Sequence, residues 1–297
     1  ASWVKKHTIT FERTVDMEEL KGMPFLKRKL SAKQPKISTR YKFYEMKNVP
    51  FDFNISTPPD LKAWFSTVGW CAKAVDSLSD RLQFREFAED NFDMNEIFNM
   101  NNPDVLFDSA MLGALISSCT FIYISKDEND YPRLQVIDGY NATGIIDPFT
   151  SMLTEGYAVL TRDSNGKIID EAYFTPEKTT FYKNGKETFS QDNASNYALL
   201  VPVIFRPDAI RPFGHSRISR ACMSIVGSAL RTIKRSEIAA EFYSYPQKYV
   251  TGLAEDADMD KWKLALSSMI TATKDEDGDH PLFGQFSQQS MQPHVTS

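Results

Sequence analysis

The sequence predicts an α+β protein: a region of mixed helices and strands, then one long amphipathic helix, then a small strand–helix–strand piece. Apolar residues recur at helical spacing over residues 61–87 and 104–117. Between residues 131 and 206, short β-branched and aromatic runs alternate with tight-turn signals, a pattern typical of antiparallel strands. About thirty helix-favouring residues then follow Gly214 and end before Pro246.

The composition is that of an ordinary folded protein. The chain has 297 residues, 42% of them hydrophobic and 25% charged, enough to bury a sizeable core in about two compact units. Its 39 acidic and 34 basic residues give a formal net charge of −5. This balance argues against a generally basic, sequence-independent DNA-binding protein, although it leaves room for local basic patches.

The sequence gives no sign of secretion or of a membrane span. Residues 1–7 lack the apolar core of a signal peptide, and no run approaches the roughly 18 apolar residues that a span needs. Cys71, Cys119 and Cys222 are widely spaced in apolar, helix-like surroundings, which favours buried free thiols over a disulfide or a metal site. We therefore expect a soluble intracellular protein with no membrane partner.

The N-terminal region is polar, and we expect residues 1–39 to form an arm. Its basic cluster, residues 27–29 with Lys33, fits either a solvated arm or peripheral helix, or a nucleic-acid contact. Residues 40–44 predict a helix end, which the turn at Val49-Pro50 follows.

A helix is expected from residue 61 to residue 87, because the two prolines and the acid of residues 57–60 suit a first turn. We expect the rings of Trp64, Trp70 and Phe84 to lie in the core.

A second helix over residues 104–117 follows favourable capping chemistry at Asn102-Pro103. A β-branched and aromatic strand then covers residues 119–125 and ends in the charged turn 126–130.

The next region is predicted to be rich in strands. Asn165-Gly166 and Asn184-Gly185 indicate hairpin turns, because Asn-Gly adopts the positive φ angles of a tight turn. Asp147 and Asp163 are accordingly interpreted as turn residues rather than catalytic acids. The expected strands are residues 133–137, 143–146, 157–161, 168–174, 179–183 and 201–205.

The long helix after Gly214 separates its basic and apolar residues. At roughly 100° per residue, five basic side chains share one stripe about 100° wide. They are Arg217, Arg220, Arg231, Lys234 and Arg235. The opposite side carries Ile218, Cys222, Ile225, Ala229, Ile233 and Ala240. The basic stripe fits a solvated face, ion pairs between subunits, or a surface that faces DNA phosphates.

After Pro246 the sequence predicts a strand at residues 248–251, a helix at 258–269 and a strand at 282–286. A piece of about 40 residues is small to fold alone, so we expect oligomerisation to stabilise it.

No catalytic or cofactor-binding pattern stands out. The sequence has no phosphate-binding loop, and its four scattered histidines form no zinc pattern. Gly214 to Ile218 begins like a nucleophile elbow but lacks the final glycine, so we expect Ser216 to cap a helix start. The acidic residues 275–279 lack the spacing of a calcium loop. We expect neither an enzyme nor a cofactor.

Three segments resemble the portal proteins of tailed bacteriophages, in particular the Gp6-like group. They are GWCAKAVDSLSDRL at residues 69–82, SSCTFI at 117–122, and RPFGHSRISR at 211–220 followed by EFYSYPQKY at 241–249. The resemblance extends over most of the chain from about residue 40 onward.

The resemblance implies a portal-like fold in named parts. After the arm, residues 40–210 are similar to the wing, 211–245 to the first stem helix and 246–287 to the clip. By the same comparison, residues 288–297 would begin a second stem helix, and the chain would stop before the rest of that helix, the tunnel and the crown.

The function implied is that of a structural virion protein. Portal subunits form a ring of about twelve copies at one capsid vertex, assembled in the cytoplasm of the host bacterium. Double-stranded DNA passes through the ring without sequence specificity during packaging and ejection. The implied protein partners are terminase, a head–tail connector or adaptor, and capsid and scaffolding proteins.

The resemblance also suggests where the partners bind. We expect the clip to dock terminase or adaptor through an exposed acidic patch of Glu255, Asp256 and Asp258. Two other readings remain open: a hydrolase on an α+β scaffold that uses Ser216 or a carboxylate, and another connector protein of the virion.

Overall fold

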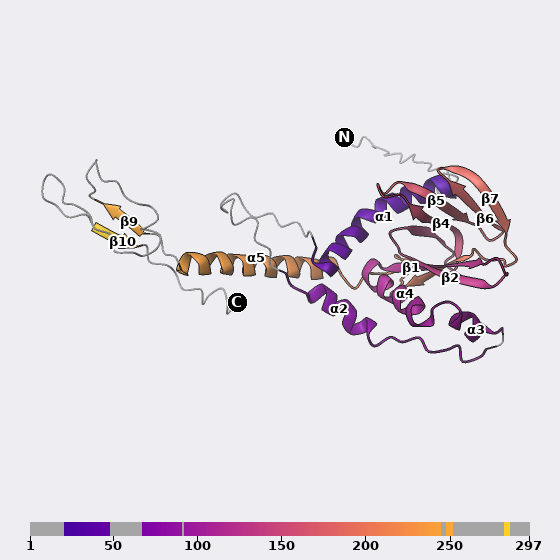
Figure 1. The fold of residues 1–297 in the computed structure, drawn as a ribbon, viewed down its shortest axis with the longest axis horizontal. Helices are drawn as coiled ribbons and strands as arrows, with labels where there is room; N and C mark the ends of the chain where they lie inside the picture. Colours follow the sequence, from indigo (N-terminus) through magenta and orange to yellow (C-terminus); the bar gives the residue numbers. More distant parts are fainter. Residues whose placement is uncertain (1–20, 48–66, 91, 245–247, 252–281, 286–297) are drawn as a thin grey trace, which may run out of the picture. The chain divides into compact units, whose positions relative to one another are not determined.

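A computed structural model describes residues 21–47, 67–90, 92–244, 248–251 and 282–285 (Figure 1). The chain divides into two compact units, residues 1–49 with 69–224 and residues 50–68 with 225–297. The described residues form helices and antiparallel sheets, so the predicted mixture of α and β structure is confirmed. None of the helices in these ranges is long and apolar enough to span a membrane.

The first unit contains a three-stranded antiparallel sheet in the order β2-β1-β8. The central strand β1 (Cys119–Lys126) pairs with β2 (Pro132–Ile137) on one side and with β8 (Leu200–Ile204) on the other. All three strands lie where the sequence predicts them, and β1 is the clearest run of β-branched and aromatic residues.

A five-stranded antiparallel meander follows in chain order. Its strands are β3 (Ala142–Ile146), β4 (Leu153–Arg162), β5 (Ile168–Phe174), β6 (Lys178–Lys183) and β7 (Lys186–Asp192). Gly166 and Gly185 adopt φ angles of 79° and 78°, which confirms both predicted Asn-Gly turns. The sequence did not predict β7, because all of its residues are exposed and no buried face marks it.

The two sheets of the first unit share one hydrophobic core. Phe121 of β1, Phe174 of β5 and Leu200 of β8 belong to the same cluster and are at most 1% exposed. The rings of Tyr123 and Phe174 lie edge to face, with centroids 5.3 Å apart. Burial of an apolar side chain of this size contributes about 1.5–3 kcal/mol, so this cluster holds the sheets together.

Helix α1 (Gly22–Glu45) contacts β3 and β4 as well as the helices of the first unit (Figure 1). Its buried residues Leu26 and Leu30 pack beside Tyr157 and Val159 of β4. Of the two forms expected for this segment, an arm or a peripheral helix, residues 22–39 adopt the helix, and it is packed against the sheet. The helix end expected near residues 40–44 is confirmed.

An ion pair between a partly exposed lysine and a buried carboxylate connects α1 to the meander. Glu171 of β5 is 2% exposed, and the Lys27 Nζ lies 2.7 Å from one of its carboxylate oxygens. The Tyr157 hydroxyl donates a hydrogen bond to the other oxygen. A buried carboxylate needs such partners, because an unpaired charge in the interior costs several kcal/mol.

Helix α4 (Pro103–Ser117) confirms the helix predicted over residues 104–117. Its first turn carries Pro103 and Asp104 as the sequence indicated, but the Asn102 side chain makes no capping hydrogen bond. Its C-terminal half is buried from Gly113 to Ser117, so it forms the interior helix of this unit.

The long helix predicted over residues 61–87 is shorter where the structure describes it. Helix α2 covers Trp70–Ser79, and the chain is not helical over residues 82–90. Trp70 is 53% exposed, so its expected place in the core is wrong. Phe84 is packed as predicted, with its ring 4.2 Å from that of Phe107 and 4.8 Å from that of Phe98.

A short helix that the sequence did not predict, α3 (Met94–Asn99), supplies Phe98 to this aromatic group. Residues 61–66, with Trp64, lie outside the described part of the chain.

Helix α5 (Arg220–Ser244) is 25 residues long and begins six positions after Gly214. In the second unit, β9 (Lys248–Thr251) pairs antiparallel with β10 (Leu282–Gln285), and both strands were predicted. The helix expected at residues 258–269 and the second stem helix expected at 288–297 lie outside the described residues.

We predict that Tyr157→Phe lowers the free energy of unfolding by about 1–3 kcal/mol at neutral pH, because Glu171 loses a donor. Burial, and then Glu171, raises the pKa of Tyr157 above its ordinary value. A raised folded-state pKa gives stability that is complete below the unfolded pKa of about 10 and is lost as the pH rises above it. The deficit of the variant should therefore shrink above pH 10.

Urea unfolding at several pH values measures this difference. Tyr197→Phe is the matched control, because that side chain is 52% exposed. A Tyr157→Phe deficit that stays constant up to pH 11 would contradict the prediction.

Candidate functional site

The segment that links β8 to α5, residues 205–219, contains most of the RPFGHSRISR sequence and is here named the joint. Gly214 adopts a φ of 71°, and a Cβ atom there would lie 2.2 Å from the Phe205 carbonyl oxygen. The His215 amide donates to that same oxygen at 2.9 Å. The chain therefore turns back onto the end of β8, and only glycine fits at the turn.

The joint is bonded to the C-terminal end of α4. The Ser216 hydroxyl donates to the Ile116 carbonyl at 2.6 Å, and the Arg217 amide donates to the Leu115 carbonyl at 2.8 Å. The last carbonyls of a helix have no hydrogen-bond donor within the helix, and the joint supplies donors for two of those in α4. The Arg217 guanidinium also donates through Nε to the Ala74 carbonyl of α2.

Helix α5 is capped by Ser219, not by Ser216 as the sequence suggested. The Cys222 amide donates to the Ser219 hydroxyl at 3.1 Å, the usual bond of an N-cap residue. The Ser216 hydroxyl instead accepts from the Ile218 amide at 3.0 Å, within the joint. The prediction was wrong because the helix begins three residues later than a cap at Ser216 requires.

Phe213 points from the joint toward two lysines of α1. The Nζ atoms of Lys29 and Lys33 lie 4.8 Å and 5.4 Å from its ring centroid. A cation at this distance is attracted to the ring face. Lys33 also donates to the Cys119 Sγ at 3.0 Å, and Lys29 donates to the Gly144 carbonyl at 2.7 Å.

The lysines of the N-terminal basic cluster are thus structural. Burial lowers the pKa of Lys29, and the neighbouring Lys33 lowers it further. Lys27 is paired with Glu171. The hydrogen bonds of these three amines are all made to groups of the first unit.

The joint does not contain a nucleophile paired with a base. The two ring nitrogens of His215 lie 2.6 Å from Asp208 Oδ2 and 3.2 Å from Arg211 Nη1. The hydrogen bond from His215 holds the pKa of Asp208 below its usual value, and the Arg211 amide adds to this. Ser216 bonds only to backbone atoms, so its contacts do not support a hydrolase.

Three of the five predicted stripe residues lie exposed on α5. Arg220, Arg231 and Arg235 are separated by eleven and four positions, so they share one side of the helix. This set is named the arginine face. Arg217 lies before the helix, and Lys234 is 3% exposed, so neither belongs to it.

The buried side of α5 explains why Lys234 differs from the prediction. Val226, Leu230 and Lys234 follow one another at intervals of four and are at most 3% exposed. At roughly 100° per residue, this row lies about 100° away from the side predicted to be apolar. Ile225, on the predicted apolar side, is 62% exposed. The expected clip patch of Glu255, Asp256 and Asp258 lies outside the described residues.

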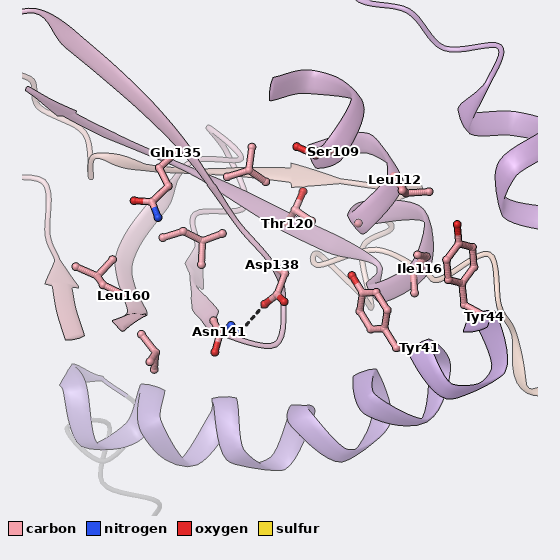
Figure 2. Close-up of a pocket in the computed structure, with 14 residues that line it drawn as sticks. Tyr41, Tyr44, Ser109, Leu112, Ile116, Thr120, Gln135, Asp138, Asn141 and Leu160 are labelled. Atoms are coloured by element: carbon pink, nitrogen blue, oxygen red, sulfur yellow. Dashed lines mark hydrogen bonds between the residues drawn. The ribbon is translucent and has the colours of Figure 1, made fainter. Parts of the chain in front are cut away.

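A cavity of about 440 Å³ lies beside α1, α4 and the turn that follows β2 (Figure 2). Tyr41 and Asp138 face it, and burial and then Asp138 raise the pKa of Tyr41 to about 12. The backbone amide of Asn141 donates a hydrogen bond to Asp138 Oδ1 at 2.8 Å. The hydroxyls of Thr120 and Ser109 donate hydrogen bonds to backbone carbonyls of α4.

The titratable side chains that line this cavity are one carboxylate, Asp138, and two phenols, Tyr41 and Tyr44, both with raised pKa values. Among the residues that the structure describes, no group of three acidic, histidine or cysteine side chains is arranged to hold a metal ion. The cavity therefore offers hydrogen bonds to a ligand but no nucleophile beside a base.

The sequence did not reveal the contacts of the joint with α1 and α4. Lys29 and Phe213 are 184 positions apart along the chain, and no local pattern links them. Comparisons with known proteins found no protein-family model and no curated protein that matches this chain.

We predict that Gly214→Ala lowers the free energy of unfolding by at least about 2 kcal/mol. The left-handed backbone alone costs a non-glycine residue about 1–2 kcal/mol, and the methyl group also meets a backbone carbonyl. Gly166→Ala is the matched control, with a φ of 79° but no atom within 4 Å of the added Cβ. Urea unfolding followed by circular dichroism measures both, and equal losses would contradict the steric argument.

Proposed function

We propose that this chain is a portal subunit, which forms a ring at one capsid vertex through which double-stranded DNA is packaged and ejected. The observation that best supports this is the order of elements. A mixed α/β region is followed by a 25-residue helix and then by a short antiparallel strand pair. The sequence resemblance at residues 69–82, 117–122 and 211–249 points to the same family.

The strand pair supports the proposed oligomer on physical grounds. β9 and β10 contain four residues each. An isolated two-stranded hairpin is at best marginally stable in water. Neighbouring copies in a ring supply the further contacts that such a piece needs.

The arginine face supports a contact with phosphates or with acidic groups of a neighbouring subunit. Arginine binds both through paired N–H groups and keeps its charge at every physiological pH. A channel for DNA requires contacts with the sugar–phosphate backbone, which do not depend on base sequence.

The remaining roles follow from the proposed ring. The ring is assembled in the cytoplasm of a bacterial host and becomes part of the virion. It binds terminase during packaging and a head–tail connector or adaptor afterwards, and it contacts capsid and scaffolding proteins during assembly.

Ring formation by the purified chain tests the proposal. Negative-stain electron microscopy and native mass spectrometry should reveal a closed ring of about twelve copies with a central opening wide enough for duplex DNA. Monomers or dimers alone, over a range of salt and protein concentrations, would contradict the portal role.

We further predict that Arg231→Glu with Arg235→Glu weakens binding of duplex DNA and reduces its salt dependence, while rings still form. Each lost phosphate contact removes about one released counterion from the salt dependence. Lys183→Glu with Lys186→Glu is the matched control, because it makes the same charge change in exposed residues of the β6–β7 hairpin. Filter binding at several salt concentrations measures the effect.

Two other results of this experiment are informative. Loss of the ring in the arginine double variant would assign the arginine face to a contact between subunits. Equal weakening in both double variants would show a general charge effect and no specific role for the arginine face.

A further inference from the structure

Two of the three cysteine thiols of this chain lie in contact. Cys71 is in the first turn of α2 and Cys222 is in the first turn of α5, 151 positions later. Their Sγ atoms are 3.5 Å apart, and neither forms a disulfide. A disulfide bond is about 2.05 Å long, so a small side-chain movement brings the atoms to bonding distance.

We propose that Cys71 and Cys222 form an oxidative modification site, which a low-molecular-weight disulfide converts to an intramolecular disulfide bond. The proposal concerns the first unit alone, which contains both cysteines, and does not depend on the portal role.

The position of the thiols is set by the joint rather than by the cysteines themselves. Arg217 bonds to the Ala74 carbonyl, one turn of α2 beyond Cys71. Ser219 caps the turn of α5 that contains Cys222. Because both helix starts are held by these bonds, the two sulfurs stay adjacent without a covalent link.

The two thiols differ in exposure, which sets the order of the reaction. Cys222 is partly exposed, whereas Cys71 is 0% exposed. The Cys222 thiolate therefore attacks the reagent first. The reagent's S–S bond breaks, one thiolate leaves, and a mixed disulfide forms at Cys222.

The second step completes the exchange. The Cys71 thiolate attacks the Cys222 Sγ, the mixed disulfide breaks, and the second reagent thiolate leaves with a proton. In total, two protein thiols are oxidised and one reagent disulfide is reduced to two thiols. Burial, followed by the contact with Cys222, raises the pKa of Cys71 to about 12, which makes this the slower step at neutral pH.

Cys119 provides an internal comparison. It is 0% exposed, and its sulfur accepts a hydrogen bond from Lys33 at 3.0 Å. Among the described residues it has no thiol neighbour, so it lacks a partner for a disulfide within the chain. Packing alone explains Cys119, whereas the contact between Cys71 and Cys222 adds a defined chemistry.

The test uses the purified, reduced chain and oxidised glutathione as the reagent. We expect one glutathione adduct to appear first and then to disappear, leaving a mass about 2 Da below that of the reduced chain. The number of thiols alkylated after denaturation should fall from three to one. Peptide mapping should identify the Cys71–Cys222 link, and the thermal midpoint should rise by about 5 °C or more.

Single variants assign the two steps. Cys71→Ser should retain the glutathione adduct at Cys222, Cys222→Ser should form no adduct, and Cys119→Ser should behave like the unmodified chain. The slower step should accelerate as the pH is raised from 7 to 9.

Three results would overturn the proposal. They are an adduct on Cys222 that persists in the unmodified chain at pH 9, three thiols that remain alkylatable after prolonged oxidation, or a disulfide that includes Cys119. Circular dichroism of each variant before oxidation separates a loss of reactivity from a loss of fold.

Discussion

The carbonyl oxygen of Phe205 determines the course of the chain at residues 214 and 215. It leaves no space for a side chain at residue 214, so the chain reverses there through a glycine with positive φ. That reversal turns Phe213 toward Phe121 and directs Ser216 and Arg217 to the end of α4. The segment that leads into α5 is therefore held against β8 and α4 by a few backbone-directed bonds.

In helix α1, basic side chains stabilise the fold of the first unit through hydrogen bonds. The amines of Lys27, Lys29 and Lys33 have three different acceptors: a carboxylate, a backbone carbonyl and a thiol. Each bond offsets the cost of taking the amine partly out of water. Basic residues that remain for contacts outside the first unit include those of the arginine face of α5.

Local chemistry predicted the parts of the fold in which neighbours along the chain decide the outcome. The Asn-Gly turns, the strand β1 and the start of α4 after Asn102 are of this kind. The same reasoning missed the packing of α1. Charged lysines are normally assigned to the solvent side of a helix, whereas these lysines are hydrogen-bonded to groups of the first unit. That reasoning also placed the buried side of α5 about 100° from its true position, since the side that is buried depends on what packs there. The contacts of Phe213 and Ser216 were unpredictable for the same reason.

Under the proposed portal role, the joint is the segment that leads from the α/β region into the stem helix, and it is bonded to α4 and α2. Ser216 and Arg217 bond to three backbone carbonyls on α4 and α2, those of Ile116, Leu115 and Ala74. Backbone carbonyls are held in place by their own helices, so the segment that leads into α5 is anchored to two helices of the first unit. The Cys71–Cys222 pair forms a further contact, between the first turn of α2 and the first turn of α5. Oxidation would replace a connection of hydrogen bonds that open and close by one that cannot open without reduction. The joint and the proposed disulfide would therefore hold the region of Ser219 and Cys222 to α2 at neighbouring points, Ala74 and Cys71.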